Sequence, residues 1–233
     1  MRKKNGFKMT APKAVILLSG GLDSTTTLYY AQKQRYQCFA LIFNYGQRHH
    51  KEIQHAKKIA KLAGVHYRVM KIDLPWKGSS LLDRNKKVPH LRSLSEIARE
   101  IPSTYVPARN TIFLSFAVSY AEAIGAEAVF IGANAIDFSG YPDCRPSFYR
   151  AFQKIIATGT KAGVAAAASR KPGTVPSIKI ITPLIHLTKP QIVALGRRLH
   201  APLELTWSCY LGGKRPCGKC DSCRLREKGL GKE

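Results

Sequence analysis

A cluster of small and hydroxyl residues at positions 19–26 contains the residue types that point most directly to chemistry. It holds two consecutive glycines, four hydroxyl side chains and one carboxylate, Asp23. Glycine lets the backbone approach phosphate oxygens closely, and hydroxyl and backbone N–H groups donate hydrogen bonds to them. A carboxylate repels phosphate unless a divalent cation lies between the two, so Asp23 predicts a bound cation such as Mg²⁺. These residues together predict a polyphosphate site.

The neighbouring segments place this cluster between a strand and a helix. Residues 14–18 are a continuous apolar run, typical of a buried strand, and residues 27–32 are predicted to form the first helix. A strand, a glycine turn and a helix point backbone N–H groups at an anion, and Ser24 is a candidate cap for the helix. A ligand-free Gly-Gly turn would explain the glycines and Ser24, but it would not explain Asp23. The cluster matches neither the Walker A pattern nor the Gly-x-Gly-x-x-Gly pattern.

The pattern Ser-Gly-Gly-x-Asp-Ser at residues 19–24 resembles the pyrophosphate-binding loop of ATP-pyrophosphatase enzymes. Those enzymes cleave ATP between its α- and β-phosphates and use the AMP to activate a carbonyl or carboxylate oxygen. The resemblance implies ATP and Mg²⁺ as cofactors, and it leaves the substrate open. It implies that the nucleotide is bound by Leu18, Ser19, Gly20, Gly21, Leu22, Asp23, Ser24, Thr25, Thr26, Thr27 and Leu28.

Four cysteines near the C-terminus form a second chemical cluster. Cys217, Cys220 and Cys223 are separated by two residues each, and Cys209 lies upstream. Four thiolates suit tetrahedral zinc, and Cys-x-x-Cys turns bring pairs of them within reach of one ion. An iron–sulfur cluster also suits four thiolates, but the spacing departs from the usual ferredoxin run; disulfides fit a reducing compartment poorly. We predict a structural Zn²⁺ site with no open position for catalysis.

The rest of the chain alternates between predicted strands and helices. Further strands are predicted at residues 37–43, 66–72, 128–132 and 179–184, and further helices at residues 51–63, 109–124, 148–157 and 189–199. A long loop with one short helix near 94–99 is predicted for residues 73–104, and a surface excursion for residues 159–176. Nearly continuous apolar strands indicate an α/β fold with a doubly wound, mostly parallel, Rossmann-like sheet of the adenine nucleotide alpha-hydrolase type. Ligands bind such sheets beyond the carboxyl ends of the strands, so the loops at 19–24, 44–50 and 133–146 should converge.

Length and composition predict one core with a small appendage. The chain has 233 residues, of which 45% are hydrophobic. We predict a basic tail at residues 1–12, an ATP-pyrophosphatase domain at 13–200 and a zinc-binding segment at 201–233. No apolar run reaches the roughly 18 residues of a membrane span, and no apolar signal-peptide core is present, which predicts a cytoplasmic protein. The net charge of +24 makes a nucleic-acid partner conceivable, although the scattered basic residues favour a solvated surface.

Several stretches together resemble one family. They are Asn-Tyr-Gly-Gln-Arg-His at 44–49, Tyr-Val-Pro-Ala-Arg-Asn at 105–110, Asp-Phe-Ser-Gly-Tyr-Pro-Asp-Cys-Arg-Pro at 137–146, Thr-Pro-Leu at 182–184 and Thr-Trp-Ser-Cys-Tyr at 206–210. With the phosphate loop and the cysteine-rich end, they span nearly the whole chain and resemble the 7-cyano-7-deazaguanine synthase family of queuosine biosynthesis. The resemblance implies a homodimeric ligase that forms carbon–nitrogen bonds. It converts 7-carboxy-7-deazaguanine, ammonia and two ATP into the 7-cyano product through an adenylated carboxylate and an adenylated amide.

The resemblance also implies roles for single residues. Asp23, Lys189 and Arg109 are the predicted catalytic groups, with the two cations directed at the α-phosphate or the leaving pyrophosphate. One of two aspartates would accept hydrogen bonds from a guanine-like edge, Arg145 would pair with the substrate carboxylate, and a tyrosine would stack on the base. The predicted substrate-binding residues are Tyr45, Gln47, Tyr105, Asp137, Tyr141, Asp143 and Arg145.

Two other functions stay open at this point. An ATP-pyrophosphatase that adenylates a base in tRNA, of the thiolation or lysidine type, is favoured by the +24 charge and opposed by the pocket motifs. A non-catalytic, zinc-bearing nucleic-acid-binding module is opposed by the complete pyrophosphate loop.

Overall fold

A single parallel sheet forms the centre of the computed structural model, which describes residues 11–93, 96–97, 101–134, 141–169 and 177–231. The strands lie in the order β3-β2-β1-β4-β5, and every neighbouring pair is parallel. Their bounds are β1 Lys13–Leu17, β2 Gln37–Asn44, β3 His66–Lys71, β4 Ala128–Phe130 and β5 Lys179–Ile181. The predicted doubly wound parallel sheet is confirmed.

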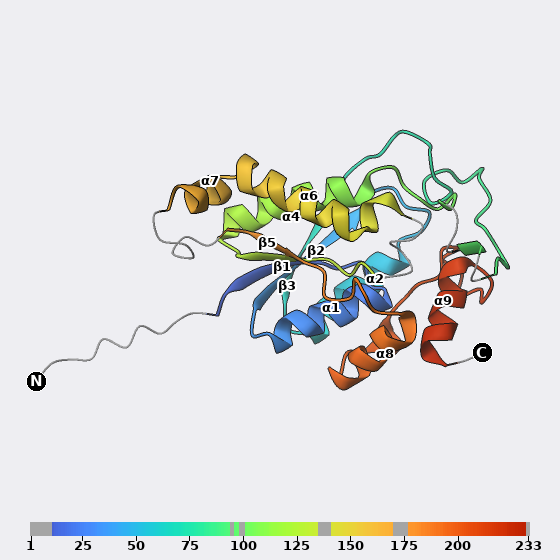
Figure 1. The fold of residues 1–233 in the computed structure, drawn as a ribbon. Helices are drawn as coiled ribbons and strands as arrows, with labels where there is room; N and C mark the ends of the chain where they lie inside the picture. Colours follow the sequence, from blue (N-terminus) through green and yellow to red (C-terminus); the bar gives the residue numbers. More distant parts are fainter. Residues whose placement is uncertain (1–10, 94–95, 98–100, 135–140, 170–176, 232–233) are drawn as a thin grey trace, which may run out of the picture.

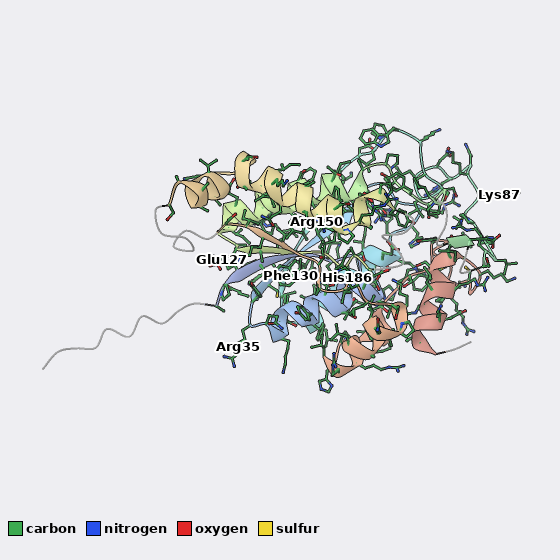
Figure 2. All side chains as sticks on the ribbon, in the orientation of Figure 1. Arg35, Lys87, Glu127, Phe130, Arg150 and His186 are labelled. Carbon is green, nitrogen blue, oxygen red and sulfur yellow. The ribbon has the colours of Figure 1, made fainter. Side chains whose placement is uncertain are left out.

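Two cores cover the two faces of the sheet, because successive strand residues point to opposite sides. Val15 and Leu17 pack in one core with α4 (Arg109–Ile124) and α6 (Pro146–Gly159). Ala14 and Ile16 pack in the other with α1 (Leu22–Lys33) and α2 (Lys51–Leu62). Figure 1 shows α4 and α6 on one side of the sheet and α1 on the other. Burial on both faces explains why the strands are apolar at nearly every position; Phe130, labelled at the centre of Figure 2, is 1% exposed.

Helix α1 begins five residues earlier than predicted, at Leu22, so that half of the phosphate loop belongs to its first turn. Its N-cap is Gly21, and the predicted cap by Ser24 is wrong. Ser24 instead ties the loop to itself: its hydroxyl accepts from the Ser19 N–H at 3.1 Å and donates to the Gly21 carbonyl at 3.2 Å. The hydroxyls of this loop therefore fix its own shape.

Helix α7 (Lys161–Ala168) lies within the stretch that was predicted to be a surface excursion. Most of these residues are exposed, so their surface position agrees with that prediction; the helix itself was not predicted, and Thr160 caps it by accepting from the Gly163 N–H at 2.9 Å. A Cβ at Gly163 would lie 2.2 Å from the Ile156 carbonyl oxygen, so the glycine permits close packing on α6. The short helix predicted near 94–99 lies largely outside the described residues, since only 96–97 of it are described.

The C-terminal part of the chain lies at the carboxyl edge of the sheet, and α7 lies at the opposite edge (Figure 1). Helix α8 (Lys189–Arg198) starts with a capping box between Thr188 and Gln191, which confirms the predicted threonine cap. Helix α9 (Asp221–Leu230) was not predicted, and its Gly229 lies against α8. Short 3₁₀ helices occupy Pro142–Cys144 and Leu203–Leu205. Within the described residues no helix has the length and apolarity to span a membrane.

Candidate functional site

A cavity of about 270 Å³ opens at the carboxyl ends of the strands, where the fold predicts a ligand site. All three loops expected to converge contribute to its lining, through Ser19, Tyr45 and Tyr141. Lys189 at the start of α8 and Arg226 on α9 complete the ring of polar groups. The cavity therefore joins the phosphate loop to residues that lie far away in the sequence.

The phosphate loop reaches this cavity because Gly20 packs tightly against α2. Gly20 has φ +84°, and a Cβ there would lie 2.6 Å from the Glu52 carbonyl oxygen, so this position requires glycine. Six of the predicted nucleotide-binding residues line the cavity: Leu18, Ser19, Gly21, Leu22, Asp23 and Ser24. The other five, Gly20, Thr25, Thr26, Thr27 and Leu28, do not, and the last four are fully buried in the body of the fold.

Asp23 is the centre of a charged group inside the cavity. Its Oδ2 accepts from the Lys189 ammonium and from the Asn134 amide, the latter at 2.5 Å. Its Oδ1 is buried and has no hydrogen-bond partner among the described residues. A carboxylate oxygen left without a donor in a buried site fits a ligand to a hard divalent cation. Asn134 was not predicted, because it follows β4 with no motif of its own.

Arg109 supplies a second cation. Its Nη1 donates to the Tyr45 hydroxyl at 3.2 Å. Burial alone would lower the pKa of the Arg109 guanidinium, but Tyr45, Tyr141 and Asp143 hold that pKa above its ordinary value. Burial raises the pKa of the Tyr45 phenol, which stays protonated. The cavity thus contains a positive charge, the Arg109 guanidinium, that can bind an anionic group of a substrate.

The predicted substrate-binding residues divide into two sets. Tyr45, Gln47 and Tyr141 line the cavity. Asp143 is buried beneath it and accepts from the Asn110 N–H at 3.0 Å, and burial raises the pKa of its carboxyl. The Tyr105 hydroxyl accepts from the Ala108 N–H, and Arg145 is exposed; neither lines the cavity. Asp137 lies outside the described residues.

Several lining residues were missed. Glu52 on α2 lines the cavity, and burial raises the pKa of its carboxyl to about 7 although the charge of Arg109 opposes the shift. An acidic residue in the first turn of a surface helix is ordinary in sequence, so Glu52 gave no signal. The C-terminal segment forms a further wall, with Trp207, Ser208, Tyr210, Ser222, Leu225 and Arg226.

The four predicted metal ligands come together beside this wall. The Sγ atoms of Cys209, Cys217, Cys220 and Cys223 all lie within 4.8 Å of one another, and those of Cys217 and Cys223 are 3.9 Å apart. Zn–S bonds of about 2.3 Å in a tetrahedron would set sulfur atoms roughly 3.8 Å apart, so the arrangement fits one ion. The backbone N–H groups of Lys219 and Cys220 point at the Cys217 sulfur at 3.4 and 3.3 Å. The predicted cysteine set can therefore hold a metal.

Comparison with known proteins decides the family. A family model described as "Queuosine biosynthesis protein QueC" matches residues 13–233, which include the cavity and the four cysteines. The chain belongs to the QueC family. The predicted resemblance is thereby confirmed.

QueC-family relatives match along most of their length. A 7-cyano-7-deazaguanine synthase from Cyanothece sp. is 56% identical over 221 residues, covering 92% of this chain and 93% of that protein. A protein of the same name from Thermoplasma volcanium is 51% identical over 218 residues, covering 94% and 86%. The solved structure of NMN synthetase from Francisella tularensis aligns with a TM-score of 0.50, covering 96% of this chain and 79% of that chain at 19% identity, which supports the fold alone.

Proposed function

We propose that this chain is an ATP-dependent ligase that converts 7-carboxy-7-deazaguanine and ammonia to 7-cyano-7-deazaguanine. The names of relatives at 56% and 51% identity over more than nine-tenths of the chain support this activity. The geometric observation that carries it is a single cavity that holds both the phosphate loop with Asp23 and Lys189 and the Arg109–Tyr45 pair. A nucleotide and a carboxylate substrate would meet between these two groups.

The loop side of the cavity would bind the triphosphate. Backbone N–H groups at the start of α1 are available to phosphate oxygens, and Lys189 adds a positive charge. Asp23 would hold Mg²⁺ through Oδ1, and the ion when bound neutralises charge on the pyrophosphate. Since Oδ2 anchors Lys189, the one carboxylate both positions the lysine and offers a metal ligand.

The opposite side would bind the deazaguanine. Tyr45, Phe113 and Tyr141 provide aromatic surface, and Gln47 fixes the loop by accepting from the Tyr45 N–H at 2.9 Å. Arg109 would face the substrate carboxylate where it meets the α-phosphate. The predicted contacts of Asp137 and Asp143 with substrate stay part of this proposal, whereas the exposed Arg145, which lines no part of the cavity, is given no substrate contact in it.

The reaction then needs positioning and charge stabilisation more than covalent catalysis. A carboxylate oxygen attacks the α-phosphorus, and pyrophosphate leaves. Ammonia adds to the activated carbon, AMP departs with the C–O electron pair, and an amide results. The amide oxygen attacks the α-phosphorus of a second ATP, and a second pyrophosphate leaves. Loss of both nitrogen protons and departure of AMP with the C–O electron pair then leave the nitrile.

The metal at the four cysteines is proposed to be structural Zn²⁺, because four thiolates complete a tetrahedron. A homodimeric state and a cytoplasmic location remain predictions from the sequence resemblance and composition.

The test is mass spectrometry after incubation with ATP, Mg²⁺, an ammonium salt and 7-carboxy-7-deazaguanine. The nitrile should appear with about two AMP per product, as two adenylation steps require. Release of AMP that depends on tRNA, with none from the free carboxylate, would instead identify a tRNA-modifying enzyme.

A further inference from the structure

A small chamber of about 40 Å³ adjoins the main cavity. Six of its lining residues also line the main cavity: Tyr45, Gln47, Glu52, Leu81, Arg109 and Tyr210. The chamber adds Arg48 and His49. A water molecule occupies about 30 Å³ in the liquid, so the chamber has room for one molecule of that size and none for a purine-like ring.

Two groups among these lining residues can accept hydrogen bonds and have no partner in the part of the chain that the structure describes. No hydrogen bond or ion pair joins the Glu52 carboxylate to any other described residue. The His49 Nε2 lies 2.8 Å from the Cys209 carbonyl oxygen, which can only accept, so Nε2 carries the hydrogen. In the neutral ring Nδ1 is then an acceptor, and it is buried without a partner among the described residues. A small hydrogen-bond donor in the chamber would satisfy the Glu52 carboxylate, which lines it, whereas the His49 Nδ1 has almost no accessible surface through which to reach such a donor.

The two arginines of the chamber do not occupy these acceptors. The Arg48 guanidinium donates to the Ser80 carbonyl at 3.1 Å and to the Lys86 carbonyl at 2.7 Å, which ties it to the loop over the cavity. The Arg109 Nη1 donates to the Tyr45 hydroxyl. Glu52 and Arg109 both line the chamber, and Glu52 is the one acidic residue among its lining residues, so its carboxylate is the group there that can accept hydrogen bonds from a small cation.

We infer that this chamber binds the ammonium ion used by the reaction, with Glu52 as the carboxylate that holds the ion and accepts one of its protons. The inference rests on the proposed function. Transfer of a proton from ammonium to Glu52 leaves ammonia, whose lone pair attacks the adenylated carbon next to Arg109. The C–N bond forms, the bond to AMP breaks with its electrons going to AMP, and the nitrogen releases one further proton to water. The raised pKa of Glu52 suits a group that gains and loses a proton near neutral pH.

The test compares Glu52→Gln with the parent in two assays. The first is the KM for ammonium in nitrile formation, which should rise roughly ten- to a hundred-fold because a charge-assisted contact is lost. The second is carboxylate-dependent exchange of pyrophosphate into ATP without ammonium, which should stay within about two-fold because adenylation precedes the use of nitrogen. Glu127→Gln is the matched control: Glu127 is exposed, at the opposite end of the sheet (Figure 2), and should leave both values unchanged.

Each outcome decides between distinct explanations. If Glu52→Gln impairs pyrophosphate exchange as much as it impairs the use of ammonium, then Glu52 acts only by balancing the charge of Arg109. That result would overturn the inference. An unchanged KM for ammonium would also overturn it, while nitrile formation by the parent would leave the proposed function standing. A parent without carboxylate-dependent exchange would overturn both. If Glu52→Gln does not fold, Glu52→Asp keeps the charge at a shorter reach and should raise the KM for ammonium with exchange intact.

Discussion

Two walls of the cavity, the phosphate loop and the C-terminal segment, are held in shape by different means. The phosphate loop is organised by its own hydrogen bonds, with the hydroxyls of Ser19 and Ser24 3.0 Å apart. The C-terminal wall has a small apolar cluster of Val88, Trp207 and three of the cysteines. A wall with so little apolar area depends on its metal, whereas the loop is supported by the core of the sheet. One wall should therefore tolerate metal removal and the other should not.

The two walls also touch. The Trp207 N–H donates to the Gly20 carbonyl at 2.9 Å, and the Lys51 ammonium lies 4.5 Å from the centre of the Trp207 ring. His49, which belongs to the loop after β2, bonds to the Cys209 carbonyl. These contacts connect the metal ligands to the loop that would hold phosphate, so damage on the metal side should reach the nucleotide as a smaller, secondary effect.

The largest effect is expected from breaking the loop side with Asp23→Asn. Turnover should fall by about 10²–10³-fold, because Asp23 positions Lys189 and offers the metal ligand where charge develops. The free energy of unfolding should fall by only about 1–3 kcal/mol, the cost of a lost charged hydrogen bond. Zinc content should be unchanged. Steady-state kinetics, thermal melting and elemental analysis check the three parts; near-normal Mg²⁺-dependent turnover in a folded variant would contradict the assignment.

Breaking the other wall with Cys220→Ser comes next. Bound zinc should fall from about one per chain to a small fraction, and turnover should fall at least about ten-fold, because three thiolates hold the ion less well. Nucleotide binding should weaken less, since it is affected only through Trp207. Cys38→Ala is the matched control, because Cys38 is buried outside the cluster and should leave zinc in place. If elemental analysis finds iron and the protein absorbs in the visible region, the four cysteines hold an iron–sulfur cluster instead of zinc.

The contrast between the walls also explains what the sequence could predict. The strands, the loop at 19–24 and the four cysteines are local patterns: all five strands form, although β4 and β5 end two and three residues before their predicted ends, the loop joins β1 to α1, and the cysteines come together. The position of Glu52 was not predictable, because it depends on how closely Gly20 approaches α2 in three dimensions. The same holds for Arg226, which lines the cavity, and for Asn134, which is buried beneath it and meets the site through Asp23. Helix α7 was missed because Gly163 argues against a helix when its packing on α6 is unknown.

A smaller effect is expected from Tyr45→Phe, which leaves both walls intact and removes the hydroxyl that orients Arg109. The lost hydrogen bond has a charged donor, but Arg109 keeps its charge and water in the cavity can replace the hydroxyl, so the net loss should be about 1 kcal/mol and kcat/KM for the carboxylate should fall roughly five-fold. The KM for ATP should be unchanged if Arg109 serves the carboxylate. Tyr30→Phe, on α1 outside the cavity lining, is the control. Parallel losses for ATP and carboxylate would assign Arg109 to the nucleotide instead.

The smallest effect is expected from Arg145→Ala, because Arg145 belongs to neither wall of the cavity. Arg145 is exposed at the N-cap of α6 and lines no part of the cavity, so its removal should change kcat/KM for the carboxylate by less than about three-fold. Arg150→Ala, also exposed and on the same helix (Figure 2), removes the same charge and sets the scale for a nonspecific effect. The family resemblance assigns Arg145 to the substrate carboxylate, a role that would cost roughly ten- to a hundred-fold. A loss of that size with unchanged binding of an ATP analogue would require residues 141–146 to close over bound substrate, and Arg145→Lys should then recover only part of it because the bidentate fork is lost.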